Sequence, residues 1–160
     1  MKSSASYRRL FVLVIAGLAL LPMRALHAQD PEDTGLVSFF ATVGNELADA
    51  GAFAIDARSF SAILRGELNW DVTPEDIEDL VGPEFRYGPI DRFVTCEQDV
   101  PCQMAYPGTH IVLLRVAADE ERGEVSLRLG RTGGADGAVW RGFESITVRR
   151  VEGAWQVVDR

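Results

Sequence analysis

The chain has 160 residues, of which 47% are hydrophobic and 25% are charged. Four of the 16 basic residues and none of the 24 acidic residues lie before position 29, so residues 29–160 carry a formal net charge of −12. Such an acidic chain repels phosphate backbones and anionic lipid surfaces, which argues against nucleic-acid binding and electrostatic membrane docking. After position 28 there is no lysine, which excludes Schiff-base chemistry and a phosphate-loop lysine.

Residues 1–28 have the three parts of a cleaved signal peptide. Basic residues near the start precede an uncharged apolar run over 10–21, and residues 25–28 (ALHA) offer a small-residue cleavage end. The alternative, a transmembrane anchor, needs about 20 apolar residues, and this run is shorter. The sequence therefore predicts export to the periplasm or the extracellular space, cleavage after Ala28 and no transmembrane anchor after cleavage.

Two export routes remain open. Residues 8–11 (RRLF) resemble the core of a twin-arginine signal, and Arg24 is a further feature of such signals. Tyr7, however, is a large aromatic residue at the position where those signals usually carry a small hydroxyl residue, and the apolar run is strongly hydrophobic. We therefore favour the general secretory route over the twin-arginine route.

The exported part begins with a short flexible leader over 29–33 and continues as one domain over 34–160, a length within the single-domain range. Leu36, Phe40, Val43 and Leu47 recur at helical spacing and predict a helix over about 35–50. A short apolar run over 52–55 indicates a strand or an extended linker.

Two further helices are expected before the pattern changes. Apolar positions over 60–68 suggest a helix that Gly66 weakens. Thr73 and Pro74 are typical of an N-cap and a first helical residue, and Gly82 ends this helix near Val81.

From Phe85 onward the apolar period changes to two. Residues 111–118 are apolar on both faces apart from Arg115, and they predict a central strand covered on both sides. Residues 124–129 alternate as a half-exposed strand, and a glycine-rich turn over 132–137 leads to a long strand over 138–151. In that strand the apolar residue Phe143 is out of step with the alternation of Ile146 and Val148, which suggests a bulge at Gly142. Glu152 and Gly153 predict a tight hairpin before the final strand.

Helices first and strands afterwards predict an α+β fold, with the N-terminal helices packed on a curved antiparallel β-meander of four or more strands. Residues 145–159 (SITVRRVEGAWQVVD) resemble the last hairpin of nuclear transport factor 2-like and other cystatin-like domains. The resemblance implies a curved sheet that wraps a helix and leaves a conical pocket. Catalytic residues vary widely in those domains, so none is assigned here. Residues 55–58 (IDAR) resemble a segment of uncharacterised exported bacterial proteins, which implies no activity.

Cys96 and Cys102 are the only cysteines of the chain. In an exported chain such a pair predicts a disulfide. A redox pair is the alternative, but redox pairs favour a two-residue spacing at a helix N-terminus. These two cysteines instead flank Pro101 in a predicted loop, so we favour a structural disulfide.

Three polar residues are candidates for a pocket. His110 is the only histidine after position 28 and could act as a general base, although a structural histidine at a sheet edge is the favoured interpretation. Asp56 and Arg58 could hold a polar group between helix and sheet, although a local Asp–Arg pair or an Asx-type turn is favoured. One histidine and two paired cysteines argue against zinc, and we expect neither a metal nor a cofactor.

These features favour a non-enzymatic exported module that binds an unidentified protein or small ligand. The alternative is a small-ligand carrier or enzyme with a pocket between the sheet and the first helix, lined by the three polar candidates. A third possibility, an inhibitor or an envelope-assembly subunit, requires an exposed apolar patch. Trp140 is the tryptophan most expected to be exposed. The oligomeric state stays open.

Overall fold

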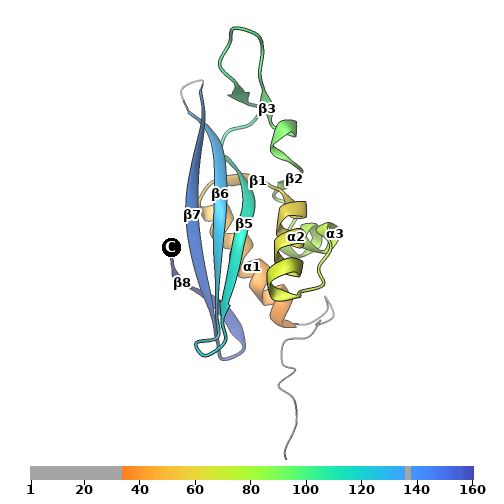
Figure 1. The fold of residues 1–160 in the computed structure, drawn as a ribbon, viewed down its shortest axis with the longest axis vertical. Helices are drawn as coiled ribbons and strands as arrows, with labels where there is room; N and C mark the ends of the chain where they lie inside the picture. The colour runs from red at the N-terminus through yellow and green to blue at the C-terminus, as the bar shows by residue number, and fades with distance from the viewer. Residues whose placement is uncertain (1–33, 136–137) are drawn as a thin grey trace, which may run out of the picture.

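The computed structural model describes residues 34–135 and 138–160, in which three helices pack on one face of a six-stranded sheet (Figure 1). The α+β prediction is therefore confirmed. The predicted signal peptide and leader, residues 1–33, lie outside the described residues. The helices are α1 (Thr34–Asp49), α2 (Ala57–Leu68), α3 (Pro74–Val81) and a 3₁₀ turn, η1 (Ile90–Arg92). The strands are β1 (Ala52–Ile55), β2 (Arg86–Tyr87), β3 (Val94–Thr95), β4 (Gln103–Met104), β5 (Thr109–Asp119), β6 (Glu124–Ala135), β7 (Ala138–Val151) and β8 (Ala154–Asp159).

Local side-chain chemistry fixes the helix starts. Thr73 accepts a hydrogen bond from the Asp76 N–H, and the Asp76 carboxylate accepts one from the Thr73 N–H, so α3 begins with a complete capping box. The Thr73 N–H and the Thr73 hydroxyl both donate to the Asp76 carboxylate, and these two hydrogen bonds lower the pKa of Asp76. Gly51 follows α1 with φ +77°, a left-handed conformation that glycine adopts without strain. All three expected helices are confirmed, each within a few residues of its predicted bounds.

The sheet is mixed, with the strand order β2-β1-β5-β6-β7-β8. Strands β5 to β8 form the expected antiparallel meander, whereas β1 pairs in parallel with both β2 and β5. The expectation of a wholly antiparallel sheet is therefore corrected at β1. The physical reason is the connection: α2 and α3 follow β1 and carry the chain back to the starting end of the sheet, as crossovers between parallel strands do.

The bulge expected at Gly142 is absent, because β6 and β7 keep one unbroken register from Glu124 opposite Arg149 onward. The irregularities lie elsewhere: between Leu113 and Arg115 in β5, between Ala52 and Ala54 in β1, and at the pairing of β7 with β8. The hairpin predicted at Glu152 and Gly153 is confirmed. Both residues have positive φ, 51° and 88°, as tight hairpin turns require.

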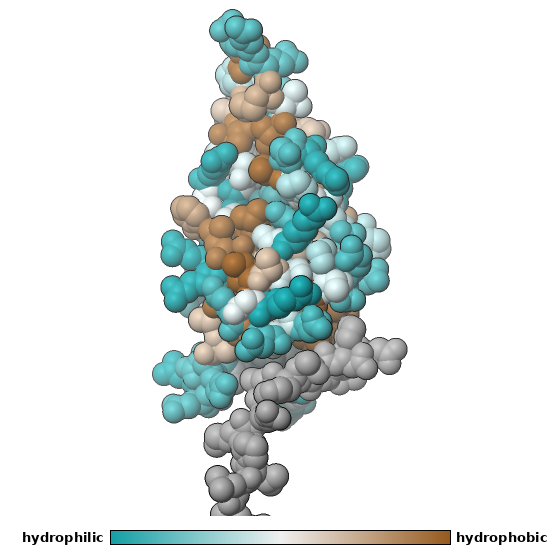
Figure 2. All heavy atoms as spheres, turned by 45° about the vertical axis from the view of Figure 1, so that its right-hand side comes forward, coloured by the Kyte–Doolittle hydropathy of each residue, from teal (hydrophilic) through white to brown (hydrophobic). Residues whose placement is uncertain are grey.

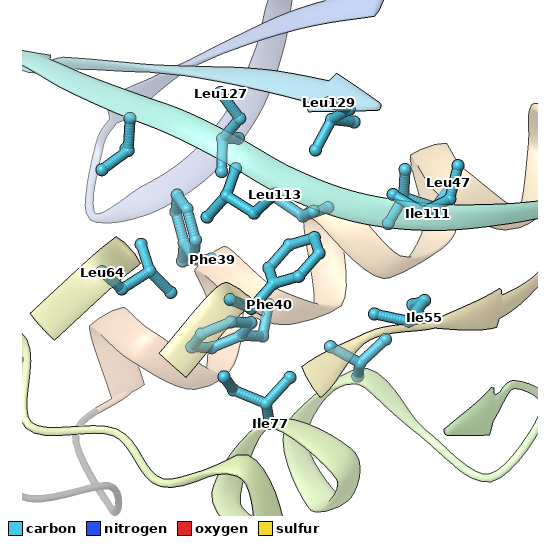
Figure 3. Close-up of a cluster of buried hydrophobic side chains, with 14 of the residues drawn as sticks. Phe39, Phe40, Leu47, Ile55, Leu64, Ile77, Ile111, Leu113, Leu127 and Leu129 are labelled. Atoms are coloured by element: carbon cyan, nitrogen blue, oxygen red, sulfur yellow. The ribbon is translucent and has the colours of Figure 1, made fainter. Parts of the chain in front are cut away.

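One hydrophobic core joins the helices to the covered face of the sheet (Figure 3). Phe39 and Phe40 of α1 are fully buried, and the Phe39 ring makes edge contacts with Phe40, Trp70 and Trp155. Side chains from β5 and β6 complete this layer opposite α1, and they include Ile111, Leu113, Leu127 and Leu129. The space between α1 and the sheet is thus occupied by close-packed apolar side chains.

Residues 90–104, which we call the excursion, extend beyond one end of the sheet and include η1, β3 and β4 (Figure 1). The predicted disulfide between Cys96 and Cys102 closes it. Phe93 anchors its base by edge contact with Phe53 and by lying against His110. Within the ranges the structure describes, no helix is both long and apolar enough to cross a membrane.

Candidate functional site

Asp56 is the N-cap of α2. Its carboxylate accepts hydrogen bonds from the backbone N–H groups of Arg58 and Ser59, at 3.1 and 3.3 Å. The Ser59 hydroxyl in turn donates to the Asp56 carbonyl and accepts from the Leu113 N–H of β5. Asp56 therefore connects the start of α2 to the sheet, and its geometry is that of the Asx-type turn.

His110 is buried inside the sheet rather than at its edge, because β5 lies between β1 and β6. Its Nε2 atom lies 2.8 Å from the Gly88 carbonyl oxygen, which can only accept, so Nε2–H donates. Burial lowers the pKa of His110 and outweighs the opposing effects of the Gly88 hydrogen bond and the Asp56 charge. The neutral imidazole is thus the favoured form.

Arg58 is exposed on the first turn of α2, and only its backbone N–H takes part in the Asp56 cap. The structure brings Asp56 within electrostatic reach of His110 but does not bring the guanidinium of Arg58 to either group. The three candidates therefore do not converge as a set, and a ligand-binding role for them stays a prediction. Both ordered groups have structural partners: a helix cap for Asp56 and a backbone carbonyl for His110.

Another polar group lies on the covered face, at the end of the sheet near the C-terminus of α1. Arg131 of β6 forms an ion pair with Glu144 of β7 at 2.7 Å and donates to the Ala50 carbonyl at 2.6 Å. The two side chains are only 20% and 18% exposed. A cation at this position stabilises the negative end of α1. We assign this pair to the joining of helix and sheet.

Among residues 34–135 and 138–160, no helix lies on the opposite face of β5, β6 and β7 (Figure 1). An apolar cluster lies on that face. Phe143 of β7 is 72% exposed and lies opposite Gly130 of β6. On the other side of Gly130, the side chains of Val112 and Leu114 fill the space that a Cβ atom would occupy. Leu114 is 42% exposed. We call these residues, Val112, Leu114, Gly130 and Phe143, the open-face cluster.

Space-filling Figure 2, in which the side of α2 and α3 is turned toward the viewer, shows hydrophobic areas bordered by hydrophilic side chains. Arginines border the open-face cluster. The Arg128 guanidinium lies 5.5 Å from the centre of the Phe143 ring, in cation–π geometry. Arg115 lies directly opposite Arg128, and Arg141 is two residues before Phe143 on the same face of β7. All three arginines are exposed, and none forms an ion pair with a carboxylate of residues 34–135 or 138–160.

Trp140 is exposed, as expected, but it lies on the covered face. Its indole ring lies over Gly133 of the neighbouring strand and beside Gly142 of its own. An aromatic ring over a strand glycine replaces the packing that the missing side chain cannot give. Trp140 thus stabilises the end of the β6–β7 pair beyond the helices.

Sequence reasoning missed the open-face cluster, although a signal was present. Ile146 and Val148 point into the core, so Phe143 has the parity of the exposed residues Arg141 and Ser145. That mismatch was interpreted as a bulge, when it marks an aromatic residue on the open face. The prediction that residues 111–118 are covered on both sides was wrong at Leu114, where the β5 irregularity places an exposed side chain.

No group of three or more His, Cys, Asp or Glu side chains within the described part of the chain is arranged to hold a metal ion. Tyr87 also has a shifted pKa. Burial, with the negative charges of Glu84 and Glu78, raises its pKa to about 12, and its hydroxyl donates to the Glu78 and Gly82 carbonyls at the end of α3. Comparisons with protein-family models, curated proteins and solved structures found no match to this chain.

Proposed function

We propose that this protein is an exported, non-enzymatic binding module that contacts a partner protein through the open face of its sheet. The observation that carries the proposal is Phe143, a large aromatic side chain that is 72% exposed at the centre of an ordered strand. Aromatic and arginine side chains dominate the binding energy of protein interfaces, and both types meet here.

The chemistry of the face supports a binding role better than a stabilising one. Phe143 stays largely in water, so it gains little from burial when the chain folds. Arg115 and Arg128 are direct cross-strand neighbours, and like charges in that position destabilise a strand pair. Neither feature benefits the isolated fold, whereas an interface would bury the ring and compensate the two positive charges.

Export is supported by two independent features. The first is the N-terminal pattern of basic residues, apolar run and small-residue cleavage end. The second is the Cys96–Cys102 disulfide, a bond that persists in oxidising compartments. Together they support a binding activity outside the cytoplasm.

The carrier or enzyme alternative is less well supported. It requires a pocket between the sheet and α1, and that space holds Phe39, Phe40, Leu47 and other buried side chains. Asp56 and His110, which would supply its chemistry, have hydrogen-bond partners within the fold.

Site-specific photo-crosslinking tests the proposal. A photoreactive phenylalanine analogue replaces Phe143 in one protein and, as the matched control, Val37 of α1 in another, because Val37 is also an exposed apolar residue at 44%. After export in the native host, we expect discrete adducts from position 143 and none of the same mass from position 37. No adduct at position 143, or equal adducts at both positions, would contradict a specific binding face.

A second variant excludes a trivial loss of folding. Phe143→Ser is combined with the photoreactive residue at Leu114, also in the open-face cluster. We expect the adduct from position 114 to fall at least about tenfold, with an unchanged melting temperature, since about 1.4 kcal/mol of lost binding energy gives that factor. An undiminished adduct would show that Phe143 does not contribute to binding.

A further inference from the structure

The edge of the sheet beside the open-face cluster is only half occupied. Strand β8 pairs with residues 147–151 of β7, while β6 pairs with β7 along its whole length. Residues 138–146 of β7 therefore have no strand on the β8 side within the part of the chain that the structure describes. Figure 1 shows β8 lying along only one end of β7. We call residues 138–146 the free edge.

A free edge presents backbone N–H and C=O groups without partners, and an extended segment of another chain can join it as a new strand. Here the edge lies directly beside the open face. Arg141 and Phe143 belong to the free edge itself, Arg128 lies on the adjacent strand, and Arg115 lies one strand further in. An added strand would thus gain backbone hydrogen bonds and side-chain contacts from the same surface.

The charge of this surface differs from that of the molecule. Acidic residues outnumber basic ones in the chain by 24 to 16, and the strongly acidic helix α3 lies on the covered side. The open face next to the free edge instead carries three arginines without ion-pair partners among the described residues. Of its acidic positions, Asp119 and Glu124 lie at the far hairpin end of β5 and β6, and Asp159 of β8 lies opposite Thr147, beyond the end of the free edge. This part of the surface is therefore complementary to negative charge.

From these observations we infer that the free edge of β7 binds an extended, acidic segment of a partner protein as an additional strand of the sheet. This inference rests on the proposed binding function and names its partner chemistry. Side chains directly opposite on neighbouring strands lie about 4.5–5.5 Å apart at their Cβ atoms. An acidic residue opposite Arg141 and an apolar residue opposite Phe143 would satisfy both, and alternate positions of the partner strand face the same side.

Neighbouring features limit the length and position of the added strand. Asp159 of β8 pairs with Thr147, so an added strand must end at the level of Ile146. Trp140 and Glu144 face the covered side, where Glu144 has Arg131 as its ion-pair partner. The specificity for acidic residues therefore comes from the open face.

Synthetic peptides of about nine residues test the inference. At the positions that face the open side, the probe carries glutamate and valine in turn, so that a glutamate lies opposite Arg141 when a valine lies opposite Phe143, and the intervening positions carry threonine. One control replaces each glutamate with lysine, and a second keeps the glutamates but carries N-methyl groups that remove its ladder N–H donors. We expect the glutamate peptide to bind at least about tenfold tighter than either control. Hydrogen exchange should slow at amides of residues 138–146 on binding, and not in α2.

Two arginine variants locate the charge effect. Arg141→Glu, on the free edge, should weaken binding of the glutamate peptide by at least about tenfold. Arg149→Glu is the matched control. Arg149 is an exposed arginine of the same strand, but it lies where β8 already pairs and it has Glu124 as a partner. Its replacement should change the affinity by less than about threefold.

Each outcome decides the inference. Equal binding of the glutamate and lysine peptides, or binding without slowed exchange in residues 138–146, would overturn it. Concentration-dependent protection of residues 138–146 without any peptide would also overturn it, because the edge would then be occupied by a second copy of this chain. If none of the peptides binds but position 143 still gives a specific photo-adduct, strand addition is refuted and the binding face is not. Failure of both experiments would refute the binding face itself.

Discussion

The two faces of the six-stranded sheet are built from the same strands but differ in what packs against them. On the covered face, Leu127, Leu129 and Ile146 are almost entirely buried against the helices. On the open face, Phe143 of β7 and Leu114 of β5 are exposed among arginines that have no ion-pair partner within residues 34–135 and 138–160. Since side chains alternate along a strand, one face can be selected for stability and the other for binding. The comparison shows that the open face is free to carry residues that contribute little to folding.

The largest expected effect comes from truncating the same residue type on each face. Phe39→Ala removes a fully buried ring that contacts three other aromatic rings, and it should lower the free energy of unfolding by about 3–5 kcal/mol. Phe143→Ala should change it by less than about 0.5 kcal/mol, because the ring is already mostly in water. Urea denaturation of both variants measures the difference. A large loss in Phe143→Ala would show that the open face stabilises the fold.

A smaller effect separates two cross-strand Arg–Glu pairs. Glu144→Gln breaks the half-buried pair with Arg131 and should cost about 1.5 kcal/mol, because a charged hydrogen bond is lost where water has little access. Glu124→Gln breaks the pair on the open face and should cost less than about 0.5 kcal/mol, because the partner, Arg149, is 46% exposed and stays hydrated, whereas Arg131 is 20% exposed. Thermal and urea unfolding measure both changes. Equal costs would contradict the different roles assigned to the two faces.

The smallest effect concerns His110, which the excursion covers. Its folded-state pKa lies below the ordinary value of 6.5, so the unfolded chain binds the proton more readily. Its contribution to stability is therefore complete above about pH 6.5 and is lost as the pH falls from there through the folded-state pKa. His110→Gln keeps a donor for the Gly88 carbonyl but does not titrate. Urea unfolding between about pH 7.5 and pH 5 should show a weaker loss of stability in this variant than in the parent protein.

Much of the fold could be predicted because the signals are local. The spacing of Leu36, Phe40 and Val43 gives α1 a single apolar face, and Thr73 with Pro74 marks the start of α3. Glu152 and Gly153 mark the last hairpin by their tolerance of positive φ. Each of these features depends on neighbours within a few residues.

The candidate site could not be predicted in the same way. Asp56 and His110 were considered as pocket residues because of their chemistry, yet the Ser59 bridge to β5 and the Gly88 carbonyl determine what they contact. The free edge of β7 depends on where β8 ends relative to β7, a register between two strands. Phe143 was visible in the sequence, but its exposure depends on which face the helices cover.

By itself, the sequence determined the α+β class, the three helices, the antiparallel meander and the disulfide, because periodicity, capping residues, turn residues and cysteine pairing act over short distances. Only the tertiary structure decided that β1 joins the sheet in parallel, that one sheet face stays open and that half of the β7 edge has no strand beside it among the described residues. These features arise from contacts between distant segments, and such contacts are selected by the packing of the whole core.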